Sequence, residues 1–325
     1  MDTRMASSLN LPLLRMFEAV ARLGSFSEAA TALHVSQPAV SRAVRELEEQ
    51  VGLPLIERGS DLHRSAIRGV RLTPDGQALQ AHAQGIFALE HAAVQDLRQR
   101  VGLQSGTLVV AASTTVAGYW LPGYLALWRQ HYPRLHCALR VGNTEEVAGW
   151  VARCEADVGL VEGEVTGPTL EVADWHEDAM ALVAAPDHPL ARAGTVTPRQ
   201  LQSCRWLARE AGSGTRTEME AFWAAMGIAP AACDELGSNE AIARVAAAGD
   251  GVALLPQVLV ADLLQLQALQ VLAPSAAMLR RAPTVQRQQR PAGTCWVRAL
   301  HVLTLRGRPR GPAVSTFMTL LRPPG

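Results

Sequence analysis

The chain has 325 residues, of which 48% are hydrophobic, and this is enough to build two or three domains with buried cores. No segment stays apolar for the ~18 residues that a membrane helix needs, and no apolar signal core follows the polar N-terminus, so we expect a cytoplasmic protein without membrane contact. The formal net charge is 0, but residues 106–279 are acidic and residues 280–325 are basic, so local patches still allow nucleic-acid binding.

Residues 10–52 have the pattern of three short helices. We expect Asn10 to cap the first helix, which Gly24 ends, Ser27 to cap the second and Ser36 the third. A tight turn before the third helix makes this a helix-turn-helix, whose third helix presents polar side chains that suit bases and phosphates. The expected DNA-binding residues of this helix are Ser36, Gln37, Pro38, Ser41, Arg42 and Arg45. The alternative is a small helical bundle with an ordinary solvated face, which helical spacing alone does not exclude.

A basic hairpin is predicted directly after the third helix. Residues 53–56 and 69–72 have the composition of two strands, and the tip between them is rich in arginine. After a helix-turn-helix, such a hairpin is typical of a DNA-binding wing, although a solvated loop would have the same composition. We expect its DNA contacts to come from Arg58, Arg64 and Arg68.

A long helix is predicted to follow the hairpin. Thr73, Pro74 and Asp75 are typical of a helix start, and apolar residues recur at helical spacing from Leu79 to Val101. A helix of about 30 residues is long for a globular domain, so we expect its apolar stripe, with Ile86 and Leu97, to pair with the same helix of a second copy.

From Thr107 onward, buried strands alternate with helices, which predicts an α/β domain with a mostly parallel sheet. Four strand-to-helix junctions in this region carry small polar residues. Ligands of open α/β sheets bind beyond the carboxyl ends of strands, where helix N-termini favour anions. Plain helix capping is the alternative for each junction, but four in one domain favour an anion-binding cleft. The expected effector-binding residues are Ser113, Thr114, Asn143, Thr144, Glu162, Gly212, Ser213, Gly214, Thr215 and Ser238.

The sequence carries little that is typical of enzymes or metal sites. The five cysteines are scattered without the spacing of a zinc site, so we expect no metal. There is no Walker loop, no Gly-x-Ser-x-Gly elbow and no His-Glu-x-x-His, so we expect no catalytic residues, no enzyme and no cofactor.

The segment GSFSEAATALHVSQPAVSRAVREL, at residues 24–47, resembles the LysR-type transcriptional regulators. The runs LIER and RLTPDGQAL extend this resemblance through the predicted wing. The runs AST, GNTEEV, LVEG and GSGTR are similar to the branch of that family that regulates carbon fixation and sulfur assimilation. Two departures stand out, because the wing tip is longer than usual and residues 281–293 look like an insertion.

The resemblance implies a complete domain organisation. Residues 1–73 would form a winged helix-turn-helix, residues 74–105 a dimerising linker helix, and residues 106–325 a periplasmic-binding-protein-like effector domain. That domain would have two subdomains, at about 106–164 with 275–325 and about 165–274. The implied partners are double-stranded promoter DNA, a small-molecule effector, a homodimer or homotetramer, and RNA polymerase if the protein activates transcription.

Two other classes of protein would share part of this pattern. The α/β half alone suggests a solute-binding component of a transport system, and an α/β half can also form a small-molecule enzyme. The predicted N-terminal winged domain disfavours the first, and the lack of an acid, base or nucleophile arrangement disfavours the second. We therefore predict a sequence-specific transcriptional regulator controlled by a small, anionic metabolite.

Overall fold

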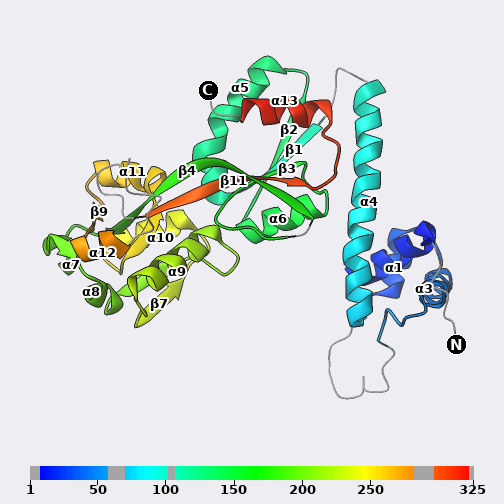
Figure 1. The fold of residues 1–325 in the computed structure, drawn as a ribbon, viewed down its shortest axis with the longest axis horizontal. Coiled ribbons are helices and arrows are strands. Elements are labelled where there is room, and N and C mark those ends of the chain that lie inside the picture. The colour runs from blue at the N-terminus through cyan, green and yellow to red at the C-terminus, as the bar shows by residue number, and fades with distance from the viewer. Residues whose placement is uncertain (1–7, 58–69, 102–106, 168, 282–295, 322–325) are drawn as a thin grey trace. The chain divides into compact units, whose positions relative to one another are not determined.

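A computed structural model describes residues 8–57, 70–101, 107–167, 169–281 and 296–321 of the chain (Figure 1). The chain divides into two compact units, Met1–Gln95 and Asp96–Gly325. Among the helices of the described residues, none combines the length and apolar character needed to cross a membrane.

The first unit begins with the three predicted helices, α1 (Leu11–Leu23), α2 (Phe26–Ala32) and α3 (Gln37–Val51). The Asn10 side chain caps α1, and Gly24 ends it in a left-handed conformation with φ of 67°. The expected cap of α2 at Ser27 is wrong, because Ser25 accepts the hydrogen bond from the backbone N–H of Glu28 and the helix starts earlier. Apolar side chains of the three helices form one core, which includes Leu14, Phe17, Val20, Val40, Val44 and Leu47.

The base of the predicted hairpin is a single antiparallel bridge between Ile56 and Leu72. Backbone hydrogen bonds from Glu57 N to Arg71 O (3.0 Å) and from Thr73 N to Leu55 O (3.0 Å) extend this pairing on either side. The predicted wing contacts Arg58, Arg64 and Arg68 lie outside the described residues.

Helix α4 (Pro74–Val101) starts directly against the hairpin base. The Thr73 hydroxyl accepts from Gly76 N (3.0 Å) and donates to Pro54 O (2.7 Å). Gly76 is buried, and a Cβ atom at this position would lie 2.0 Å from the Leu55 carbonyl oxygen, so the close approach requires glycine.

One residue of the expected helix–helix seam in α4 has another role. Ile86 is partly buried and packs against the core of the first unit, a contact that the sequence analysis did not expect. Among the described side chains of α4, the large exposed apolar residues are Leu89, Val94 and Leu97. Position 86 was assigned to the seam because helical spacing shows that residues share a face but does not show which protein surface covers that face.

The second unit is built on a mixed sheet with the strand order β2-β1-β3-β11-β4-β8, and β9 also pairs with β4. The pairs β1–β2 and β1–β3 are parallel, but β11 joins β3 and β4 in antiparallel fashion, as β8 joins β4. The expectation of a mostly parallel sheet is therefore wrong for this half of the sheet. The strands of this path are β1 (Thr107–Ser113), β2 (His136–Gly142), β3 (Val158–Glu162), β4 (Leu170–Ala184), β8 (Ala253–Pro256) and β11 (Trp296–Leu305).

Strands β4 and β11 run through the whole second unit and connect two lobes (Figure 1). In the first lobe, α5 (Leu121–His131) and α13 (Pro312–Leu320) cover one face of β1, β3 and β11, and α6 (Thr144–Ala152) covers the other. In the second lobe, α9 (Gly214–Met226) packs on one side of β4 and β8, and α10 (Asn239–Ala247) with α11 (Gln257–Gln265) packs on the other.

Short elements complete both lobes. A π-helical turn, η1 (Val116–Trp120), precedes α5 in the first lobe. The second lobe adds a parallel pair of strands, β6 (Arg205–Ala208) with β7 (Ala232–Glu235), beside β8. Its remaining elements are α7 (Pro189–Arg192), β5 (Thr195–Val196), α8 (Pro198–Gln202), β9 (Gln270–Val271), β10 (Ala273–Pro274) and α12 (Ala276–Arg281).

Candidate functional site

Helix α3 presents the residues predicted to contact DNA on its surface. Its buried stripe consists of Val40, Ala43, Val44 and Leu47. The predicted DNA-binding residues lie off this stripe: Ser36, Gln37, Pro38, Arg42 and Arg45 are exposed and Ser41 is partly exposed. Ser36 precedes the helix without a side-chain capping bond, and Arg45 donates to the Ser41 hydroxyl (3.2 Å).

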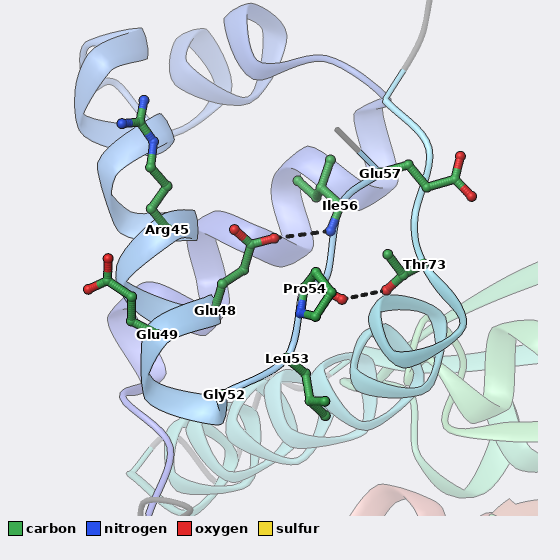
Figure 2. A pocket seen from close by; sticks show the side chains of 9 residues that line it. All are labelled: Arg45, Glu48, Glu49, Gly52, Leu53, Pro54, Ile56, Glu57 and Thr73. Atoms are coloured by element: carbon green, nitrogen blue, oxygen red, sulfur yellow. Dashed lines mark hydrogen bonds between the residues drawn. The ribbon is translucent and has the colours of Figure 1, made fainter. Parts of the chain in front are cut away.

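A groove separates the C-terminal half of α3 from the hairpin base (Figure 2). Glu48 spans it, because one of its carboxylate oxygens accepts from Leu55 N (2.9 Å) and Ile56 N (3.2 Å). Glu49 and Glu57 also line the groove, with Arg45 as its basic residue. Three carboxylates at this end of α3 would repel phosphate groups.

In the second unit, the ends of β1 and β6 meet across the two lobes. The Ser113 hydroxyl is buried and accepts from Val116 N (3.3 Å), which makes it a cap for the following turn. The Thr114 hydroxyl accepts from Arg209 Nη1 (3.1 Å). Arg209, which the sequence analysis did not select, is buried, and its other nitrogens donate to the Glu210 carboxylate (2.8 and 2.7 Å).

The starts of α6 and α9 also meet at this boundary. The Thr144 hydroxyl donates to Glu162 O (3.1 Å) and accepts from Gly214 N (3.1 Å). A Cβ atom at Gly214 would lie 2.2 Å from the Glu162 carbonyl oxygen, so only glycine allows the start of α9 to come this close. Gly212 adds a backbone hydrogen bond here, because its carbonyl oxygen accepts from Glu145 N (3.2 Å).

Three more of the predicted residues lie at helix starts, where two of them act as caps. Asn143 forms a capping box with Glu146, in which both hydrogen bonds measure 2.9 Å. Ser238 caps α10 by accepting from Ala241 N (3.3 Å). Ser213 is buried at the start of α9 without a side-chain capping bond.

A chain of buried hydrogen bonds links the two lobes through Thr215. The Thr215 hydroxyl accepts from Arg298 Nη1 (2.9 Å) and from Asn239 Nδ2 (3.3 Å). Asn239 Nδ2 also donates to the hydroxyl of Thr115 (3.0 Å) in the first lobe. Thr115, Asn239 and Arg298 were not predicted. Thr115 and Asn239 adjoin the chosen runs Ser113–Thr114 and Ser238 and could have been included, whereas nothing local distinguishes Arg298.

Arg298 is the centre of this network. Its side chain has no exposed area, and its Nε and Nη2 donate to Asp178 Oδ2 (2.9 and 2.7 Å). Its Nη1 lies 3.5 Å from Glu162 Oε1. Burial raises the pKa of Asp178, and the neighbouring Arg298 guanidinium opposes that rise. One buried cation therefore faces two buried carboxylates at the point where the lobes join.

Within the described residues, no three His, Cys, Asp or Glu side chains come together in a way that would hold a metal ion.

A helix-turn-helix domain followed by a two-lobed α/β domain with a buried polar junction is typical of a ligand-responsive DNA-binding regulator. Two family models match the chain: "Bacterial regulatory helix-turn-helix protein, lysR family" over residues 11–77 and "LysR substrate binding domain" over residues 102–323. The chain belongs to the LysR family of transcriptional regulators.

Relatives and solved structures agree with this family. A probable RuBisCO transcriptional regulator of Cyanidioschyzon merolae is 32% identical, over 83% of this chain and 89% of that protein. The regulator CysL of Bacillus subtilis is 33% identical, over 75% of this chain and 79% of its own length. The named relatives are transcriptional regulators and not enzymes, as expected from the sequence.

Two solved structures share the fold. Full-length OxyR from Pseudomonas aeruginosa has a TM-score of 0.62 at 21% identity, covering 97% of this chain and 95% of that one. The Synechocystis CcmR regulatory domain, solved in complex with 2-PG, has a TM-score of 0.56 at 25% identity, covering 67% of this chain and 96% of that one.

We predict that Arg298→Met destabilises the second unit by about 3–5 kcal/mol, because it leaves the buried carboxylates of Asp178 and Glu162 unpaired. Urea unfolding followed by tryptophan fluorescence measures this directly, since all seven tryptophans lie in the second unit. The control is Arg310→Met, which removes a half-exposed pairing with Glu171 and is expected to cost less than about 1 kcal/mol. Equal losses in the two variants would contradict a central role for Arg298.

Proposed function

We propose that this LysR-family regulator binds double-stranded operator DNA through α3 and the wing, dimerises through α4 and responds to a small anionic metabolite held between the lobes of its second unit. The observation that carries the effector part is the polar junction, where the ends of β1, β3 and β6 meet the starts of α6, α9 and α10. If the regulator activates transcription, RNA polymerase would be a further partner. The protein would act in the cytoplasm.

The DNA contact is assigned to the N-terminal half of α3 on the basis of exposure and charge. Gln37, Ser41 and Arg42 lie off the buried stripe and away from the acidic groove formed by Glu48, Glu49 and Glu57. These side-chain types can bond base edges in the major groove.

Arg42→Ala is expected to weaken operator binding by about 1–3 kcal/mol, the cost of one base contact, without lowering stability. Fluorescence anisotropy with an operator fragment selected from genomic DNA would measure the affinity. The matched control is Arg22→Ala, on the surface of α1, where Arg22 pairs with Glu18 and should not affect DNA. An Arg42→Ala protein that binds as tightly as wild type would refute the assignment of α3.

The dimer contact is assigned to the exposed apolar residues of α4. Leu97 is 62% exposed, and Leu89 and Val94 are more than 40% exposed on the same helix. Water-exposed apolar side chains on a long helix favour pairing with a second helix.

We predict that Val94→Asp combined with Leu97→Asp gives monomers at low micromolar concentration, because charges would be buried in the seam. Sedimentation velocity measures the oligomeric state. Leu266→Asp, at a position that is 75% exposed outside α4, is the control and should leave the state unchanged. A double variant that is still dimeric would place the interface elsewhere.

The effector is assigned to the polar junction because several features there favour an anion. The starts of α6, α9 and α10 direct the positive ends of their helix dipoles toward this region. Arg209 adds a buried guanidinium that contacts Thr114 across the lobes. The related CcmR domain binds 2-PG, and that observation supports an anionic effector for the present chain. A ligand that contacts both lobes would favour one closure angle and so shift the DNA-binding conformations.

Thr114→Val should weaken effector binding by about 1–3 kcal/mol, because the valine keeps the shape but leaves Arg209 and the ligand without a hydroxyl partner. A thermal-shift screen of anions, including inorganic phosphate, sulfate and 2-PG, would identify a ligand, and calorimetry would compare its affinities. Thr319→Val, an exposed isosteric change on α13, is the control. A ligand that is cationic or purely apolar, or a Thr114→Val protein with normal affinity, would refute the anion site.

A further inference from the structure

Two buried oxygen atoms at the junction of the lobes have no hydrogen-bond donor among the described residues. They are Glu162 Oε2 and Asn239 Oδ1, on side chains of residues that are 1% and 0% exposed. Buried polar atoms in native proteins are nearly always hydrogen-bonded, and an unpaired one indicates a bound water or ligand. Both atoms are acceptors, so the missing partner is a donor.

The two unpaired oxygens belong to groups that meet at one hydroxyl. Glu162 Oε1 and Asn239 Nδ2 lie 3.5 and 3.3 Å from Thr215 Oγ1, and the unpaired oxygens are the second atoms of these same two groups. Glu162 ends β3 in the first lobe, whereas Asn239 starts α10 in the second. A donor that reaches both oxygens would therefore bridge the lobes.

The guanidinium of Arg298 and the amide nitrogen of Asn239, which lie beside these oxygens, already have other acceptors. Arg298 directs Nε and Nη2 to Asp178 and Nη1 to Thr215. Asn239 directs its amide nitrogen to Thr115 and Thr215. Around Arg298, the two carboxylates of Glu162 and Asp178 face one guanidinium, so a bare anion placed beside Glu162 would be repelled.

We propose, building on the proposed anionic effector, that the effector also carries a hydrogen-bond donor, a hydroxyl or an ammonium group, which Glu162 and Asn239 recognise. The anionic group would lie at the helix starts near Arg209 and Thr114, and the donor group would face Glu162. The ligand class is then a hydroxy acid or amino acid, with carboxylate or phosphate as the anion.

The test compares anions that share a skeleton and differ only in one substituent. Succinate, malate and aspartate form a dicarboxylate series with hydrogen, hydroxyl or ammonium, and 3-phosphooxypropionate, 3-phosphoglycerate and phosphoserine form a phosphorylated series. Calorimetric titration of the full wild-type chain is expected to show, in at least one series, that a substituted member binds about tenfold or more tightly than the unsubstituted one, as for a hydrogen bond to a charged group.

Glu162→Gln should remove that preference and leave the unsubstituted anion bound as tightly or more tightly, because a negative charge is lost. Glu171→Gln, an exposed carboxylate on β4, is the matched control and should keep the preference. This pattern cannot arise from a variant that merely loses stability, since the two ligands of a pair would then weaken together.

The results distinguish the anionic effector from the additional hydrogen-bond donor. Equal binding of all members of a series by wild type overturns the donor but leaves the anionic effector in place, and this holds whether or not Glu162→Gln folds. A Glu162→Gln protein that keeps the preference also overturns the donor site. Failure of both series to bind to wild type would overturn the anionic effector and the donor together.

Discussion

The pairing of β4 with β11 is the constraint on which the second unit depends. These strands align in ten antiparallel residue pairs, from Leu170 with Leu305 to Met180 with Trp296, and they contribute to the cores of both lobes. At one of these pairs, Arg298 and Asp178, the side chains form a fully buried ion pair. Burying two charges is favourable only when geometry and further hydrogen bonds compensate for lost hydration, so this pair strongly restricts how the strands can align.

The strand alignment in turn decides which residues meet at the junction. Thr115 and Asn239 bond to each other although 124 positions separate them in the chain. Their meeting depends on α10 and η1 starting at facing ends of the two lobes, which β4 and β11 connect. Because Gly214 and Gly212 bring backbone against backbone there, small changes in the angle between the lobes would break several hydrogen bonds together. A ligand that restored or replaced these bonds would therefore change the relative stability of different angles between the lobes.

Local signals were sufficient to predict the helix-turn-helix and the long helix. Asn10 starts a helix, and Gly24 and Gly52 each end one. Each acts within one helical turn of its own position, so these helix ends can be predicted from neighbouring residues alone. The first half of strand β4, which starts at Leu170, is hard to recognise from the sequence because it is rich in charged residues. Arg298 was missed for the same reason: its burial depends on Asp178 in another strand, and strand alternation does not show which face is covered. Likewise, helical spacing did not show that the first unit's core covers Ile86 in α4.

The contact between Gly76 and Leu55 has a mechanical meaning for the first unit. Side chains can absorb small movements by changing rotamer, but two backbones in direct contact have no such freedom. Thr73 also hydrogen-bonds to Pro54 and Gly76. The first turn of α4 is therefore rigidly attached to the backbone of residues 54 and 55. A rotation of the first turn of α4 would therefore move Pro54 and Leu55 together with it.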